Sequence, residues 1–135
     1  MNYKIEEIEG IGPATAEKLA LAEITNTNEL LEKCATANGR KAVAETTGLS
    51  TKQVLVFANM ADLMRIKGVG GEFAELLKAS GVDTIKELRN RNATNLAQKM
   101  AEVNAEKKLT RRVPTESQVA AFIEGAKTLE PLITY

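Results

Sequence analysis

Apolar residues recur along the chain at intervals of three and four residues, in segments separated by glycines, prolines and short polar stretches. This spacing places apolar side chains on one face of a helix, whereas a half-buried strand would alternate apolar and polar residues. The pattern predicts helices at 3–8, 13–22, 27–36, 39–47, 51–66, 71–80, 85–91, 95–108 and 116–129. No segment alternates over the length of a strand, so we expect an all-α fold without a sheet. The final segment, Glu130 to Tyr135, contains Pro131 and is expected to be extended against the core.

The chain contains an internal repeat. When the sequence is shifted by 58 positions, residues 8–30 align with residues 66–88 without a gap, and eight of these 23 positions are identical. Farther along, an offset of 65 aligns Phe57 with Phe122, which indicates about seven extra residues within 104–113 of the second copy. Matched glycines at matched spacing favour duplication over chance. We therefore expect one repeat over 1–64 and a second over 65–135, packed as one compact helical unit.

Signals for the starts of helices repeat together with the apolar pattern. In a capping box, a side chain before the helix and one three residues later each accept a hydrogen bond from the other residue's backbone N–H. Pairs with this spacing occur at equivalent places of the two copies: Asn26 with Glu29, Thr84 with Glu87, Ser50 with Gln53, and Thr115 with Gln118. Gly48 and Gly81 stand where helices are expected to end.

A Gly-x-Gly turn precedes one helix in each copy. The segments 8–19 and 66–77 both contain an apolar residue, two glycines around a second apolar residue, and a following helix that carries a small alanine, Ala16 or Ala74. Glycine permits positive φ and a close approach of backbones, so the pattern predicts a sharp turn between two helices. Pro13 suits the first position of a helix, where its missing N–H costs nothing.

Both segments resemble the helix-hairpin-helix motif, and their pairing is similar to the tandem helix-hairpin-helix domains of DNA-repair and recombination proteins, which have a SAM-like helical architecture. Over nearly its whole length the chain also resembles an uncharacterised bacterial domain-of-unknown-function family with two helix-hairpin-helix units, through stretches such as Met64–Gly70, Glu106–Leu109 and Arg112–Pro114. The first copy has the motif's Gly10-Ile11-Gly12-Pro13, whereas the second has Gly71 in place of the proline.

The resemblance implies that the turn amides and the following helix N-terminus face a DNA phosphate, where free N–H groups and the helix dipole favour an anion. Such contacts position a protein on the backbone and read no sequence. The resemblance also implies that the carbonyl groups of these turns can hold a monovalent cation, with Gly10, Gly12, Gly68 and Gly70 as the ligands. No other cofactor is expected.

The residues around the turns depart from the DNA-binding form of the motif, which usually carries Lys or Arg just after the second glycine. Those places hold Ala14 and Thr15 in the first copy, and Glu72 and Phe73 in the second, where we expect Glu72 to face the phosphate and repel it. The first turn is approached through three acidic residues, Glu6, Glu7 and Glu9. Any contact with DNA is therefore expected at the second turn, with the first serving mainly as scaffold.

The charge distribution also points to the middle of the chain. The net charge is zero, with 18 basic and 18 acidic residues, but residues 65–112 hold eleven Lys or Arg against six Asp or Glu. The residues predicted to contact nucleic acid are Arg65, Lys67, Gly68, Val69, Gly70, Gly71, Lys107, Lys108, Arg111 and Arg112 in the second copy, and Gly10, Ile11 and Gly12 in the first. The run from Lys107 to Arg112 can equally be a solvated helix end, because cations suit helix C-termini without a ligand.

The composition excludes several kinds of metal-binding and catalytic site. The chain has no His and a single Cys, Cys34, so its inventory cannot supply a zinc or iron–sulfur site or a His-based catalytic triad. Five aromatic residues without Trp disfavour a base-stacking surface. Cys34 is expected to be buried, and a core is expected from Phe57, Phe73, Phe122, Met60, Met64 and Met100. The absence of an apolar run near the start, or of a long one anywhere, predicts a cytoplasmic protein with no membrane segment.

Three functions compete. The first is a non-catalytic nucleic-acid-binding module that contacts the phosphate backbone, DNA above all, without sequence specificity. The second is a protein–protein interaction adaptor that uses the helical repeats as a scaffold, which an exposed apolar patch would favour. The third is an enzyme of the helix-hairpin-helix glycosylase type with Lys78 and Asp83 as the candidate catalytic pair, but 135 residues leave little room for a base-flipping pocket, so we expect no enzyme.

Overall fold

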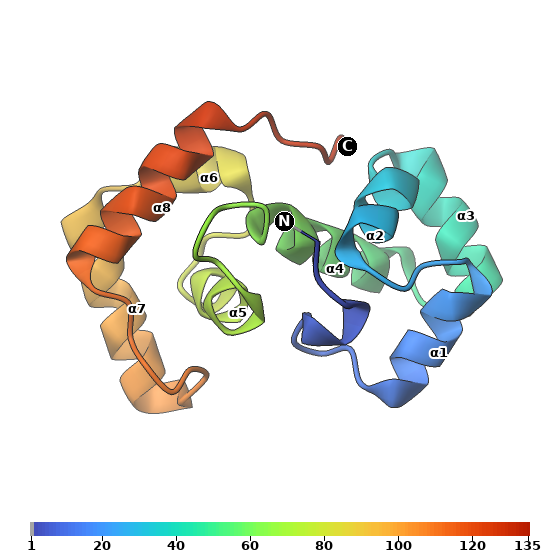
Figure 1. The fold of residues 1–135 in the computed structure, drawn as a ribbon, viewed down its shortest axis with the longest axis horizontal. Helices are drawn as coiled ribbons and strands as arrows, with labels where there is room; N and C mark the ends of the chain where they lie inside the picture. Colours follow the sequence, from blue (N-terminus) through green and yellow to red (C-terminus); the bar gives the residue numbers. More distant parts are fainter. Residues whose placement is uncertain (1) are drawn as a thin grey trace.

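A computed structural model describes residues 2–135 of the chain. Within that range the protein is all-helical, as predicted, with no strand and one isolated bridge between Lys4 and Asn26 (Figure 1). The elements are the 3₁₀ turn η1 (Ile5–Glu7) and the helices α1 (Pro13–Leu21), α2 (Thr27–Cys34), α3 (Ala37–Thr47), α4 (Thr51–Leu63), α5 (Gly71–Ala79), α6 (Ile85–Arg89), α7 (Ala93–Lys107) and α8 (Glu116–Thr128). None of these described helices is both long and apolar enough to cross a membrane.

The helix predicted at 3–8 is reduced to the single turn η1. The chain just before it is extended because it pairs with the residues around the start of α2: Thr27 N–H donates to the Tyr3 carbonyl at 2.9 Å, and Ile5 N–H to the Thr25 carbonyl at 3.1 Å. Ile8 then returns to the extended region, with φ −74° and ψ 124°, and leads into the first glycine turn.

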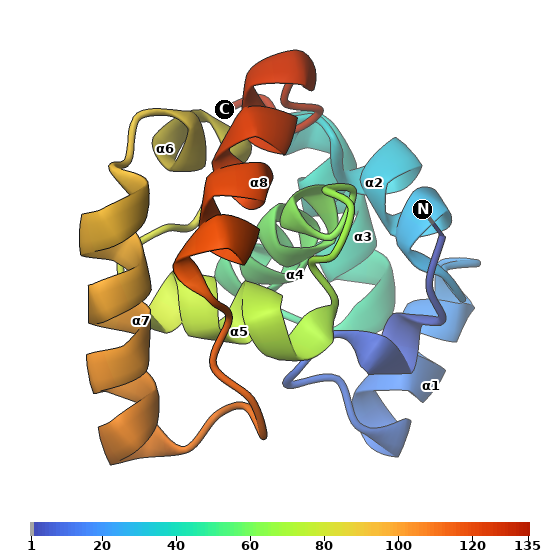
Figure 2. The same ribbon diagram turned by 60° about the vertical axis from the view of Figure 1, so that its left-hand side comes forward.

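The helices form two groups on either side of a central pair. Figure 1 shows α4 and α5 in the middle, with α1, α2 and α3 on one side and α6, α7 and α8 on the other, and the turned view of Figure 2 shows α8 running beside α7. Helix α4 packs against α2, α3 and α5, and α8 packs against α6 and α7. Helices α4 and α8 thus each support other helices of one group.

Equivalent apolar positions of the two copies are buried in one core. Ile8, Ile11, Leu19 and Ile24 in the first copy correspond to Ile66, Val69, Leu77 and Val82 in the second, and all eight are buried. Of the predicted core residues, burial is confirmed for Cys34, Phe57, Phe122, Met60, Met64 and Met100. Phe73 is the exception: it is half-buried and packs on Phe122, with ring centroids 5.8 Å apart.

Two of the four predicted capping boxes form completely, at Ser50 with Gln53 and at Thr115 with Gln118. At α2 and α6 half of the box forms, since Asn26 and Thr84 accept the expected N–H bonds at 2.8 and 3.1 Å. The strongest contacts of the Glu29 carboxylate are with Thr25, whose N–H and hydroxyl donate to it at 2.9 and 2.7 Å.

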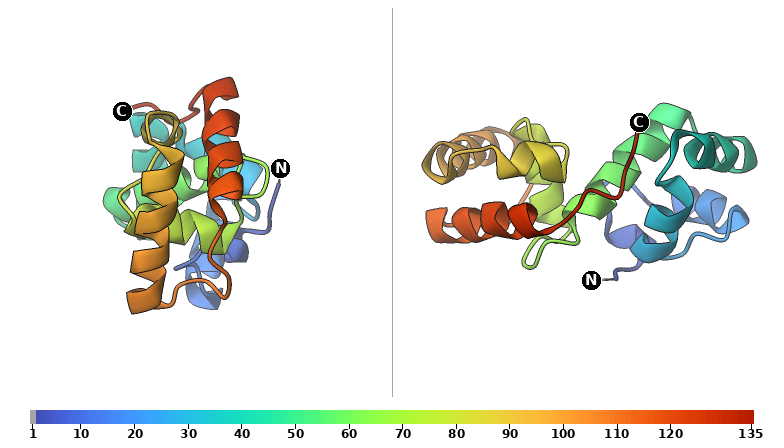
Figure 3. Two further views of the ribbon diagram at one scale, coloured as in Figure 1. Left: turned by 90° about the vertical axis from the view of Figure 1, so that its left-hand side faces the viewer. Right: turned by 90° about the horizontal axis from the view of Figure 1, so that it is seen from above.

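Predicted helix ends and the extended final segment are confirmed. Gly48 caps α3 in the left-handed conformation with φ 79°, and Gly81 has φ 94° just after α5. Residues 130–135 are extended and return to the core, where Ile133 is buried. Seen from above in Figure 3, this segment leaves α8 and runs toward α4 and the first group of helices.

Candidate nucleic-acid interface

The two Gly-x-Gly turns have the same backbone geometry. The first glycine of each has a positive φ, 95° at Gly10 and 91° at Gly68, so both turns need a residue without a side chain there. The buried residue between the glycines closes the turn: Ile11 N–H donates to the Ile8 carbonyl at 3.1 Å, and Val69 N–H to the Ile66 carbonyl at 3.0 Å. The second glycine is extended and precedes the first residue of α1 or α5.

Helices α1 and α5, which follow these turns, begin without a side-chain cap. Every other α-helix in residues 2–135 begins at an Asn, Ser or Thr whose side chain accepts a backbone N–H of the first turn. Backbone N–H groups at the start of a helix have no partner within the helix. At α1 and α5 these donors, together with the positive end of the helix dipole, therefore remain for an external acceptor.

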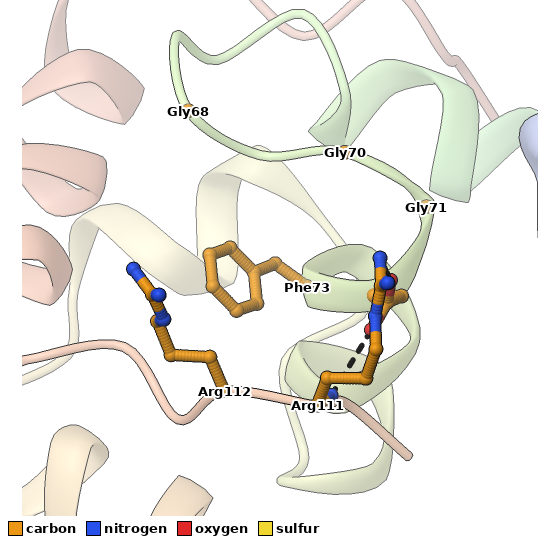
Figure 4. Close-up of a pocket in the computed structure, with 7 residues that line it drawn as sticks. Gly68, Gly70, Gly71, Phe73, Arg111 and Arg112 are labelled. Carbon is orange, nitrogen blue, oxygen red and sulfur yellow. Dashed lines mark hydrogen bonds and ion pairs between the residues drawn. The ribbon is translucent and has the colours of Figure 1, made fainter.

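A pocket of about 590 Å³ lies beside the second turn (Figure 4). It brings together the turn, the first residues of α5 and two arginines from the connection between α7 and α8, and its lining is Gly68, Gly70, Gly71, Glu72, Phe73, Arg111 and Arg112. Figure 4 shows the ring of Phe73 between the side chains of Arg111 and Arg112. Cations that are about forty residues distant in sequence thus face the uncapped start of α5.

The connection that carries these arginines is held in a defined conformation by Asn104. The buried amide of Asn104 accepts from Thr110 N–H at 2.9 Å and donates to the Thr110 carbonyl at 3.1 Å. The Thr110 hydroxyl in turn donates to the Arg112 carbonyl at 2.8 Å. This connection overlaps the range 104–113, in which the alignment of the two copies predicts extra residues.

Glu72 contacts the same connection. Its carboxylate accepts from Arg111 N–H at 3.2 Å and pairs with the Arg111 guanidinium, also at 3.2 Å. The Arg111 side chain is almost fully exposed and that of Glu72 half-exposed, so this pair contributes little to stability and more to where the connection lies. With one carboxylate against Arg111 and Arg112, the pocket keeps a formal excess of one positive charge.

The other predicted cations lie outside the lining of this pocket. Lys67 is exposed next to Gly68, and Lys107 and Lys108 are exposed at the end of α7, outside the lining of this pocket. Arg65 is already engaged: its guanidinium contacts the buried Asp62 carboxylate at 2.8 Å and donates to the Glu130 carbonyl at 3.0 Å. Arg65 lies just past the end of α4, and its three-residue spacing from Asp62 in the helix predicted at 51–66 is the sequence signal that could have identified the pair.

The first turn lacks a comparable cationic wall. Ala14 is exposed and Thr15 half-exposed at the start of α1, and Glu6, Glu7 and Glu9 are exposed beside the turn. A pocket next to α1 includes Lys4, but it also includes Glu6 and Glu17. Lys78 and Asp83, the candidate catalytic pair, are both exposed, and neither lines the pocket at the second turn.

The second turn and the start of α5 contact the N-terminal residues around η1, which the sequence did not predict. Gly71, the first residue of α5, lies directly on the backbone carbonyl of Glu7, where no Cβ would fit. The Tyr3 hydroxyl lies 3.5 Å from the Val69 carbonyl. This contact explains the glycine at position 71, because a proline ring equivalent to Pro13 would overlap η1.

The residues at the turns do not single out a cation site. Of the four carbonyl groups that the resemblance implies as ligands, those of Gly12 and Gly70 already accept the N–H of Ala16 and Ala74, each at 2.9 Å. Within residues 2–135, no group of three or more His, Cys, Asp or Glu is arranged to hold a metal ion.

These observations define an all-helical protein with two equivalent glycine turns, one of which faces a basic pocket. The chain belongs to the family described as "Domain of unknown function (DUF4332)", which matches residues 9–129. No curated protein and no solved structure matches the chain.

Proposed function

We propose that this protein is a non-catalytic nucleic-acid-binding module that contacts the phosphate backbone at its second glycine turn, without sequence specificity. The observation that carries the proposal is the shared pocket: Arg111 and Arg112 line the same cavity as Gly68, Gly70 and the start of α5. Backbone N–H groups and guanidinium groups both donate to phosphate oxygens, and neither distinguishes one base from another.

The turn geometry supports assigning both units to the helix-hairpin-helix class. In each, a glycine with positive φ, a buried apolar residue and an extended glycine precede a helix without a side-chain cap. The two units have different roles in this proposal. The second binds phosphate, because it has the arginines, and the first is scaffold, because exposed glutamates surround it.

The distribution of exposed apolar side chains favours this function over an adaptor that binds through an apolar patch. Among residues 2–135, the exposed large hydrophobic residues are Leu21 on α1 and Leu132 and Tyr135 in the final segment. An interaction patch would need several such residues side by side over a few hundred Å².

The proposal is tested by fluorescence anisotropy with labelled duplex, single-stranded and branched DNA at about 50 mM salt. We expect binding that is indifferent to sequence and that weakens to a Kd of about 10⁻⁴–10⁻⁶ M at physiological salt. The variant Arg111→Ala/Arg112→Ala should bind at least tenfold more weakly. Its slope of log K against log salt should be smaller by about 2, since each phosphate contact contributes about 0.9.

A matched variant, Lys41→Ala/Lys52→Ala, removes the same charge from exposed positions on α3 and α4. It should retain most of the affinity, because a local site depends on the arginines at the pocket and not on total charge. Absence of binding to all three DNA forms would refute the proposal. Equal losses in the two double variants would refute its location at the second turn.

A further inference from the structure

The segment 130–135 is bound to the rest of the protein in the way that a groove binds an extended peptide. It leaves α8 and crosses toward α4, as the right-hand view of Figure 3 shows, and Thr134 reaches Ala35 at the end of α2. The residues that hold it, which we call the segment groove, are Ala35, Arg40, Asn59, Asp62 and Arg65. None of them lines the basic pocket, so this site is separate from the proposed phosphate site.

Alternate residues of the segment are held by their backbones. Arg65 donates to the Glu130 carbonyl at 3.0 Å, and Leu132 N–H donates to the Asp62 carboxylate at 3.2 Å. Two residues farther on, Thr134 N–H donates to the Ala35 carbonyl at 2.8 Å. A two-residue period is that of an extended chain, whose successive residues point to opposite sides.

Arg40 is the main anchor at the far end of the groove. It is only 6% exposed, and its guanidinium donates to the carbonyls of Cys34 and Ala35, at 3.0 and 3.1 Å, and to the Thr134 carbonyl at 2.7 Å. One buried cation therefore caps the end of α2 and holds the segment at the same time. Because this buried guanidinium donates to a backbone carbonyl, the contact does not depend on the side chains of the bound chain.

Ile133 and Tyr135, on either side of Thr134, supply the side-chain contacts. Ile133 is 6% exposed and is the apolar anchor of the segment. The Tyr135 ring lies 5.7 Å from the Arg40 guanidinium, and its hydroxyl donates to Asn59 at 3.0 Å. The groove thus selects a buried aliphatic residue, and the Tyr135 ring, which is 75% exposed, adds contacts with Arg40 and Asn59 at its edge.

The segment leaves space unfilled on both sides. A hollow of about 380 Å³ lies beside Leu132 and is bordered by Leu31, Ala35 and Arg65. Another of about 330 Å³ lies beside Pro131 and Ile133 and is bordered by Asn59 and Asp62. An occupant with larger side chains at these positions would make more contacts than the chain's own residues do.

We propose that the segment groove is a peptide-binding site that the chain fills with its own residues 130–135, and that an extended peptide with an aliphatic-x-aromatic pattern displaces them. Main-chain hydrogen bonds provide affinity in this mode of recognition, and the pockets for alternate side chains provide specificity. The chain's own segment acts as a tethered competitor. Because its effective concentration is in the millimolar range, a free peptide binds the intact protein weakly until the segment is released.

The experiment uses the full chain with Ile133→Asp, which removes the apolar anchor, and a fluorescein-labelled peptide of residues 128–135. Anisotropy titration should show at least tenfold tighter binding of the peptide to this variant than to the wild type, whose groove is filled. The matched control is Leu21→Asp, which adds the same charge at an exposed position on α1, outside the segment groove, and should bind like the wild type. The same peptide with Asp in place of Ile133 should bind none of the three proteins.

A folded Ile133→Asp variant that does not bind the peptide, or that binds the Asp-containing peptide equally well, would overturn the proposal. Thr134→Pro, which removes the N–H donated to Ala35, provides a second way to release the segment. If circular dichroism shows that neither variant folds, the segment is part of the folding core and not a displaceable occupant, and the proposal is likewise overturned.

Discussion

Gly68 lies on the edge of the Phe122 ring, so that a Cβ at this glycine would stand 3.0 Å from Phe122 Cε1. The first copy has the same relationship between Gly10 and Phe57, at 3.6 Å. In each half an aromatic residue of the long supporting helix, α4 or α8, therefore lies beneath the glycine turn. In each repeat, the glycine turn therefore packs against the supporting helix, α4 or α8.

Gly68→Ala should therefore destabilise the protein by about 2–3 kcal/mol. The left-handed backbone costs a residue with a side chain about 1–2 kcal/mol, and the tight contact with Phe122 adds to this cost. Urea denaturation followed by circular dichroism measures the change. Gly70→Ala is the control, because a Cβ there meets nothing within 4 Å and φ is −99°. Equal losses in the two variants would contradict the contact with Phe122.

The sequence predicted most of this fold because its signals are local. Apolar spacing, caps and glycines placed each α-helix within a few residues, since they depend on neighbours along the chain. The 3–8 prediction failed because the backbone near Tyr3 pairs with Thr27, which is distant in sequence. The same limit applies to the candidate site: no local pattern shows that Arg111 reaches Glu72 or that Gly71 lies on Glu7.

Ser80→Ala should stabilise the protein, by about 1 kcal/mol. The Ser80 hydroxyl is buried and is the one buried side-chain polar group in residues 2–135 that has no hydrogen-bond partner. The equivalent residue in the first copy is Ala22, so alanine suits this backbone position. Thermal denaturation should give a higher Tm for this variant. Ser50→Ala, which removes a complete capping box, should lower Tm and serves as the opposite case. A lower Tm for Ser80→Ala would show that the hydroxyl has a stabilising partner.

Gly71→Ala should destabilise the protein by about 1–3 kcal/mol, because the added methyl group meets the Glu7 carbonyl and the backbone must move to accept it. The contact joins η1 of the first repeat to α5 of the second, so the loss should appear as a lower midpoint in one cooperative urea transition. Gly12→Ala is the matched control in the first copy, where a Cβ meets nothing within 4 Å. An unchanged midpoint for Gly71→Ala would mean that η1 does not rest on α5.

Cys34 should be unreactive in the folded protein. Burial raises the pKa of its thiol from 9.0 to about 11, against the opposing effect of the nearby Arg40 and Lys33 cations. Reaction with a disulfide reagent at pH 8 should therefore be slow in buffer and fast in denaturant.

The unfolded chain also loses the thiol proton of Cys34 at lower pH than the folded protein does. Stability should consequently fall as the pH rises from 9.0 to about 11. The variant Cys34→Ala should lose less stability over this pH range than the wild type does. An identical loss in the two proteins would contradict the raised pKa of Cys34.

Substitutions of Glu72 separate its two effects on the basic pocket. Glu72→Gln removes the negative charge but keeps an oxygen that accepts from Arg111 N–H, so DNA affinity should rise severalfold at about 50 mM salt and less at high salt. Glu72→Ala removes both the charge and the acceptor, which frees the connection that carries Arg111 and Arg112. Its affinity should fall below that of Glu72→Gln, because ordering the connection again on binding costs conformational entropy. Anisotropy titrations of both variants against the same duplex measure the difference. Equal affinities would mean that Glu72 acts through its charge alone, as the sequence suggests, and that its hydrogen bond to Arg111 does not position the pocket.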